Sequence, residues 1–318
     1  MILSSIVSSY IQSGEFSGLS NGAGKISIEG VAPSSFSFII ASLFAHNPVQ
    51  TLVVVKNYQR MHELYLDITC FTDPGRVVML PSWETLPYEF VSPSEKIERE
   101  RVSALYRLLK GDPVIVVTPL ESLLRAIPGK EFFLRKGFLL TKGEEYPFED
   151  LVEQFVEYGY SREYRIESPG QFSVKGSIID IFPPAMDNPV RFDFFGDTLD
   201  SIREFDINTQ RSYGEQDEVT VYPRKEIILS KNERDTISEV LQEAQGRGLS
   251  VPAVKGVSEI MEGEMVPGIE DLFPLIMEPR YLPSFLTADA RIIFSETTEL
   301  GVQKDVLEKT FTELYRKK

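Results

Sequence analysis

The stretch Thr51–Ile68, TLVVVKNYQRMHELYLDI, decides the class of fold. Its first five residues are an apolar run of strand length, and the apolar side chains after Asn57 recur at helical spacing. Two similar apolar runs follow, RVVMLP at 76–81 and PVIVVT at 113–118, and the second leads into a helical pattern. Strands that alternate with helices predict a parallel sheet covered by helices.

The residues upstream extend this alternation. The pattern KISIEG at 25–30 predicts a first strand, and SFSFIIASLF at 35–44 predicts the helix that follows it. A parallel α/β domain is therefore expected over residues 1–131.

The character of the chain changes after this domain. A helical pattern, FEDLVEQFVEYGY at 148–160, is followed by the alternating runs FSVKGSIIDIF at 172–182 and VRFDFFGD at 190–197, with Gly and Pro between them. This order predicts an inserted α+β domain with an antiparallel sheet over residues 132–223.

Residues 224–318 are expected to form a second α/β part. Strands are predicted at EIILS (226–230) and RIIFSE (291–296), and helices at DTISEVLQEAQ (235–245) and from about Thr298 onward.

The composition limits the chemistry that is available. A formal net charge of −15 disfavours contact with a phosphate backbone. A single cysteine, Cys70, excludes an internal disulfide and fits a reducing, cytoplasmic compartment. The only histidines, His46 and His62, have no spaced partners, so no metal site is expected. The longest apolar stretch is about half of what a bilayer requires, so no membrane contact is expected either.

The glycine-rich sequence NGAGK at 21–25 is a tempting phosphate loop. A working loop has glycine where this chain has Leu19, and Ser or Thr where it has Ile26. The spacing therefore favours an ordinary turn.

A second candidate loop lies between the first predicted strand and its helix, where a βα unit holds phosphate. Its residues are Gly30, Pro33, Ser34, Ser35, Phe36 and Ser37. Phe36 stands at the position of the phosphate-binding lysine, and proline has no amide hydrogen to donate. We therefore predict a degenerate loop, no nucleotide or metal cofactor and no catalytic residue. Asp180, which superficially matches a magnesium ligand, is predicted to be a strand residue.

The alternation of VRFDFFGD places an aromatic ring on a polar face. Val190, Phe192 and Phe194 share one face of the strand, and Arg191, Asp193 and Phe195 share the other. Arginine beside an exposed aromatic is typical of a binding hot spot. The structural alternative is that Phe195, next to Gly196 in a hairpin turn, covers the end of its own sheet.

Three stretches resemble the N-terminal region of the bacterial transcription-repair coupling factors. They are LPSWETLPYEFVSPSEKIERER at 80–101, GQFSVKGSIIDIFPP at 170–184 and PVRFDFFGDTLDSIREFDINTQRS at 189–212. That region is similar to the excision-repair helicase UvrB. The resemblance implies a degenerate, helicase-like P-loop domain with an inserted domain that binds UvrA, and it implies loss of the DNA-inserting hairpin, in agreement with the short connection at 88–93.

The resemblance also implies which residues bind UvrA. They are Arg191, Phe195 and Lys175, where Lys replaces the arginine common in relatives. Lys175 shares the parity of Gln171 and Ser173, so an ordinary solvated lysine is the alternative interpretation. RNA polymerase and DNA would be contacted by other domains of a longer protein, as would ATP and Mg²⁺ in its motor, and a later domain would cover the UvrA surface.

These observations lead to a non-catalytic adaptor that recruits UvrA to RNA polymerase stalled at DNA damage. The alternatives are a nucleotide-binding hydrolase, which would use unrecognised residues near 30–37, and a DNA-binding module related to UvrB. Binding of ATP separates the first alternative from the adaptor, and DNA binding that survives physiological salt supports the second.

Overall fold

The computed structural model describes residues 2–14, 16–17, 24–85, 91–248, 259 and 267–316. Within them the chain divides into two compact units, and one of the four boundaries between the units falls inside helix α5 (Glu95–Lys110). Unit 1 comprises residues 1–82, 107–125 and 281–318, and unit 2 comprises residues 83–106 and 126–280. The division into three parts at 131 and 223 stays a prediction.

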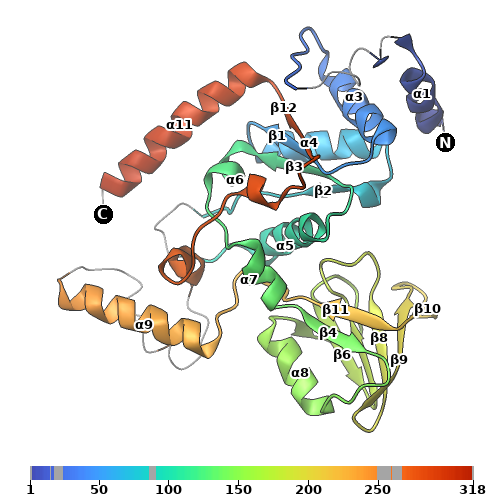
Figure 1. The fold of residues 1–318 in the computed structure, drawn as a ribbon, viewed down its shortest axis with the longest axis vertical. Helices are drawn as coiled ribbons and strands as arrows, with labels where there is room; N and C mark the ends of the chain where they lie inside the picture. Colours follow the sequence, from blue (N-terminus) through green and yellow to red (C-terminus); the bar gives the residue numbers. More distant parts are fainter. Residues whose placement is uncertain are drawn as a thin grey trace. The chain divides into compact units, whose positions relative to one another are not determined.

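Unit 1 contains the predicted parallel sheet. Its strands are ordered β12-β1-β3-β2 and all pair in parallel. They are β1 (Thr51–Val55), β2 (Val77–Met79), β3 (Ile115–Pro119) and β12 (Arg291–Phe294). Figure 1 shows that β12, drawn in red, joins strands from the blue end of the chain. The sheet is therefore completed by a segment about 240 residues away in sequence, since Thr51 is in register with Arg291.

Apolar side chains from two helices cover this sheet. Helices α3 (Pro33–His46) and α4 (Tyr58–Thr69) place Ile40, Phe44 and Met61 against Val53 and Val117 of the strands. All five residues of β1 are buried, as expected for a strand in the middle of a parallel sheet. Unit 1 also contains the helices α1 (Ile2–Ile11), α6 (Leu120–Leu124) and α11 (Thr297–Arg316).

The predicted strand at 25–29 is wrong. These residues have no strand conformation, and Ile26 and Ile28 are exposed. The reason is that β1 pairs on its two sides with β12 and β3, so the interior of the sheet is complete without them. Residues 21–23 of the NGAGK sequence and residues 88–90 of the short connection lie outside the described residues.

Unit 2 contains the predicted antiparallel sheet. Six strands are ordered β10-β9-β8-β7-β6-β5, and only the short β5–β6 pair is parallel. They are β5 (Ser161–Arg162), β6 (Gln171–Lys175), β7 (Ile178–Ile181), β8 (Val190–Phe195), β9 (Thr198–Phe205) and β10 (Ser212–Gln216). A second, two-stranded sheet pairs β4 (Phe138–Thr141) with β11 (Glu218–Val221).

One face of the six-stranded sheet forms the core of this unit. Helix α8 (Phe148–Glu157) contributes Leu151, Val152 and Phe155 to a cluster with Phe172 and Phe192 of the strands. Figure 1 shows α8 lying beside these strands. The opposite face of the sheet is therefore the one that turns away from the core.

A smaller apolar cluster surrounds Trp83. It includes Ile97 of α5, Ile227, and Ile237 and Leu241 of α9 (Lys231–Gly246). Residues 226–230, predicted as a strand, have no strand conformation, although Ile227 and Leu229 are buried. Their burial comes from side-chain packing, not from pairing in a sheet. The 3-10 helix η3 (Ile269–Leu275) adds Leu272 and Phe273 to this cluster, and α7 (Lys130–Arg135) buries Phe132 and Phe133.

No helix in the described part of the chain combines the length and the apolar character that a membrane crossing needs.

Candidate protein-docking face

The alternation predicted for β8 is confirmed. Val190, Phe192 and Phe194 are buried in the core cluster, whereas Arg191 and Asp193 lie on the opposite side of the sheet. We call this side the outward face. It also carries Lys175 and Ile178, because these residues pair in register with each other and Ile178 pairs with Asp193.

Phe195 stands at the end of β8 with 84% of its surface exposed. Two tight hairpins lie at this end of the sheet, one at 176–177 between β6 and β7 and one at 196–197 between β8 and β9. Each hairpin begins with a glycine at a φ of +62°, a conformation that other residues rarely adopt. The glycines allow the strands to turn immediately, so Phe195 is held on a short, ordered edge.

The ring of Phe195 does not fill the core of its own domain. The neighbouring residue Phe194 fills the core position instead, and its ring packs edge-on against Phe148 with the ring centroids 5.3 Å apart. The alternative in which Phe195 covers the end of its sheet does not fit a side chain with this exposure. An exposed ring of this size is available to a partner.

Lys175 is exposed at the end of β6, and its ammonium lies 5.0 Å from the centroid of the Tyr164 ring. Tyr164 is itself 88% exposed. Sequence reasoning missed this tyrosine, because it lies in an irregular segment after β5 where no alternation assigns it to a face. The structure thus places a second exposed aromatic ring, that of Tyr164, next to the ammonium of Lys175.

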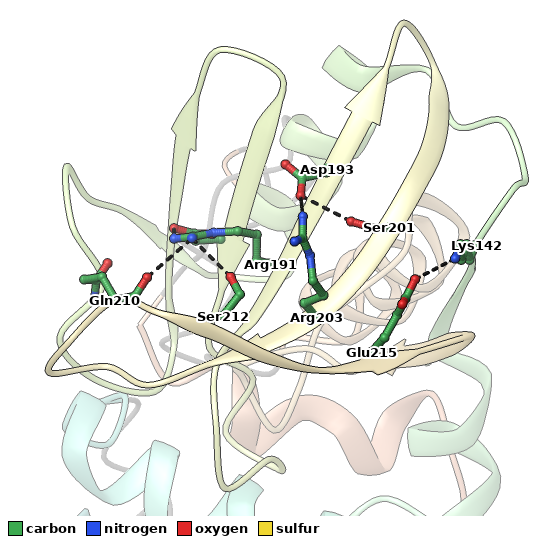
Figure 2. Close-up of polar contacts among 9 residues, drawn as sticks. Lys142, Arg191, Asp193, Ser201, Arg203, Gln210, Ser212 and Glu215 are labelled. Atoms are coloured by element: carbon green, nitrogen blue, oxygen red, sulfur yellow. Dashed lines mark hydrogen bonds and ion pairs between the residues drawn. The ribbon is translucent and has the colours of Figure 1, made fainter.

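Arg191 is engaged within its own domain. Its Nε and Nη2 donate to Asp180 Oδ1 and Oδ2 at 2.7 and 2.9 Å, and its Nη1 donates to Ser212 Oγ at 3.3 Å. The guanidinium also lies 4.8 Å from the centroid of the Phe205 ring. Figure 2 shows the side chain turned toward Ser212 and the backbone of Gln210.

The hydrogen bonds that Arg191 donates to Asp180 raise the pKa of Arg191 above its ordinary value, because they favour the charged guanidinium. Asp180 is a strand residue of β7, as predicted, and its side chain is only 3% exposed. The pair therefore joins β7 to β8 and to the start of β10. The sequence correctly predicts that Arg191 lies on the outward face. It did not predict that Arg191 forms an ion pair with Asp180.

Replacing Arg191 with methionine is expected to destabilise the domain by about 2–3 kcal/mol. A buried pair that loses one partner costs about 3–5 kcal/mol, and partial exposure of the guanidinium reduces this value. Chemical denaturation measures the change. The control is Arg203→Gln, which breaks a more exposed pair and should cost less than about 1 kcal/mol. Equal stability of the two variants would contradict the structural role of Arg191.

A second ion pair lies beside the first on the outward face. Arg203 of β9 donates through Nη2 to Asp193 Oδ2, and Ser201 Oγ donates to the same oxygen at 3.2 Å. Figure 2 shows Arg203 and Asp193 pointing toward each other, with Lys142 and Glu215 paired separately. The sequence did not single out Arg203, because its partner depends on the register between β8 and β9.

Comparison with known proteins gives a family for this part of the chain. Residues 138–227 match the model of the UvrB interaction domain. The match begins at the first residue of β4 and includes both sheets of unit 2, and therefore the whole outward face.

Curated relatives cover a larger part of the chain. The transcription-repair-coupling factor of Mycobacterium bovis is 32% identical over 258 residues, which are 77% of this chain and 21% of that protein. The proteins of the same name from Bacillus subtilis and Staphylococcus aureus are 27% and 29% identical over 78% and 68% of this chain. The chain thus spans about a fifth of the length of the relatives it matches. It is a homologue of one part of the transcription-repair-coupling factors, and its residues 138–227 are a UvrB interaction domain.

Proposed function

We propose that this chain is a non-catalytic docking module that recruits UvrA through the outward face of the six-stranded sheet. The observation that carries the proposal is Phe195, an almost fully exposed ring at a rigid hairpin edge inside the UvrB interaction domain. Titration of purified UvrA with the 318-residue chain tests it directly. Absence of binding at micromolar concentrations would contradict it.

The energetics of the face favour a protein partner. Burial of a phenylalanine side chain stabilises a complex by about 1.5–3 kcal/mol, and the ring of Tyr164 with the cation of Lys175 adds to the surface that a partner can cover. The hairpin at 196–197 orders the backbone at Phe195 before binding, so the backbone there loses little entropy. Phe195 and Lys175 are accessible for direct contact, whereas Arg191 supports the face through Asp180.

In a full-length relative, this module would couple repair to transcription. The chain would bring UvrA to RNA polymerase stalled at damaged DNA, and other domains would contact the polymerase and DNA and hydrolyse ATP with Mg²⁺. A later domain that covers the outward face would hold the module inactive until the motor engages. Each of these steps extends the resemblance beyond the residues of this chain.

The loop before α3 supports an assignment without nucleotide chemistry. Gly30 has a φ of +70°, Pro33 is the first residue of the helix, and Phe36 packs against the core of the parallel sheet. Ser37 is buried, so its hydroxyl does not face a phosphate from the surface. The side chain of Phe36 is thus used for packing within unit 1.

Titration calorimetry with ATP and Mg²⁺ is expected to show no saturable heat for this chain. A triphosphate needs a cation and several amide donors, and the loop at 30–37 has no lysine and contains a proline. A Phe36→Lys variant, which restores the charge alone, serves as the comparison. Saturable binding to the unmodified chain would favour the hydrolase alternative over the adaptor.

A further inference from the structure

The two arginines of the outward face are directly opposite each other but differ in how firmly they are held. Arg191 and Arg203 are paired in register across β8 and β9. Like charges at such a position repel, so each arginine needs a carboxylate. Asp180 supplies one to Arg191 and Asp193 supplies one to Arg203.

The hydrogen-bonding capacity of Arg191 is largely used. Its side chain is 20% exposed, it binds both oxygens of Asp180, and its remaining donors meet Ser212 and Gln210. A partner that bound Arg191 would have to break a bidentate pair and leave Asp180 without its cation. This arrangement makes Arg191 a poor donor to an incoming protein.

Arg203 has the opposite character. Its side chain is 43% exposed, and it contacts a single oxygen of Asp193 through Nη2 alone. Its Nε is buried and has no acceptor in the described part of the chain. A guanidinium has five N–H donors, so Arg203 retains donors for a second carboxylate.

The position of Arg203 places it within the same face as the exposed aromatic ring. Asp193, its partner, is two residues from Phe195 on β8 and is in register with Ile178, which in turn pairs with Lys175. Neighbouring strands are about 4.8 Å apart, so Lys175 and Asp193 are separated by about 10 Å along the sheet. One protein surface can therefore cover the side chains of Lys175, Asp193, Phe195 and Arg203.

We propose that Arg203 is a partner-binding residue of the outward face, and that Asp193 is an internal substitute for an acidic side chain of the partner. The proposal deepens the docking function and rests on it. The partner chemistry is a protein surface with an apolar pocket for Phe195 and a carboxylate within reach of Arg203. In the free chain, Asp193 orients the guanidinium and neutralises it. In the complex, the partner carboxylate takes the exposed donors, and Asp193 competes with it.

Competition between Asp193 and the partner carboxylate predicts opposite changes in affinity for two variants. Arg203→Gln removes the cation and is expected to weaken binding of UvrA about fivefold. Asp193→Asn keeps the shape of the side chain but removes the competing charge, so binding should become about threefold tighter. Both values are on the scale measured for exposed charge pairs. In the double variant most of the gain from Asp193→Asn should be lost, because the donors that this substitution releases belong to Arg203.

Titration calorimetry of purified UvrA with the four forms of the chain tests the proposal, and melting curves check that each form is folded. Glu308→Gln is the matched control. It changes the net charge by the same amount as Asp193→Asn and also frees a cation, Lys304, but this exposed pair lies on α11, outside the six-stranded sheet. Affinity for UvrA should not change in this control.

The outcomes that overturn the proposal are distinct from those that overturn the docking function. Unchanged or weaker binding of Asp193→Asn, or an equal gain in Glu308→Gln, would show that Arg203 is not released for a partner. If Phe195→Ala weakens binding while Arg203→Gln and Asp193→Asn have no effect, only the proposed role of Arg203 is disproved. If no variant of the face changes the affinity, the docking function itself falls.

Discussion

Replacement of Phe195 with alanine is expected to weaken binding of UvrA by more than about 2 kcal/mol, which is roughly 30-fold. The ring is 84% exposed in the free chain, so nearly all of its surface is available for burial in the complex. The hairpin at 196–197 orders the backbone next to Phe195, so the entropy lost on binding is mainly that of the side chain itself. Titration calorimetry measures the loss.

The same variant should fold as well as the unmodified chain. Phe195 belongs to no buried cluster, and the core position next to it is filled by Phe194. The matched control is Val156→Ala, which removes an exposed apolar side chain from α8, the helix that packs on the core face of the sheet. Val156→Ala should bind UvrA with unchanged affinity. Unaltered binding of Phe195→Ala, or an equal loss in the control, would disprove the role of the ring.

The largest expected loss of stability comes from Arg101. Its side chain is 1% exposed and donates from Nε and Nη2 to the carboxylate of Glu226, itself 2% exposed, at 2.7 and 3.0 Å. The indole Nε1 of Trp83 donates to the same carboxylate at 3.3 Å. This network joins α5 to the segment before α9 within unit 2.

Arg101→Met is expected to destabilise the chain by about 3–5 kcal/mol, because it leaves the charge of Glu226 buried without its cation. Chemical denaturation measures the change. The double variant Arg101→Met/Glu226→Gln removes both charges and should recover part of the loss. Lys142→Met, which breaks an exposed pair, should cost less than about 1 kcal/mol. A loss no larger than that of Lys142→Met would show that Glu226 reaches water.

Periodicity predicted most of the order of elements. The run TLVVV became the fully buried strand β1, and the stripe of α5 that includes Ile97 and Leu105 is buried. The same reasoning failed for two runs of the same length as TLVVV. The runs at 25–29 and 226–230 have strand-like composition but do not pair in a sheet. A strand needs a partner, and a five-residue pattern carries no information about one.

For the candidate site, the sequence by itself determined which side chains share a face, because alternation along a strand is a local property with a period of two. That argument located Arg191 and Phe195 on the outward face, and the burial pattern of β8 agrees. Only the tertiary structure decided what each charge contacts. Asp180 meets Arg191, and Asp193 meets Arg203, through the register of strands that are separate in sequence. A period along one strand does not specify the register of its neighbours, and the ion pairs follow from that register.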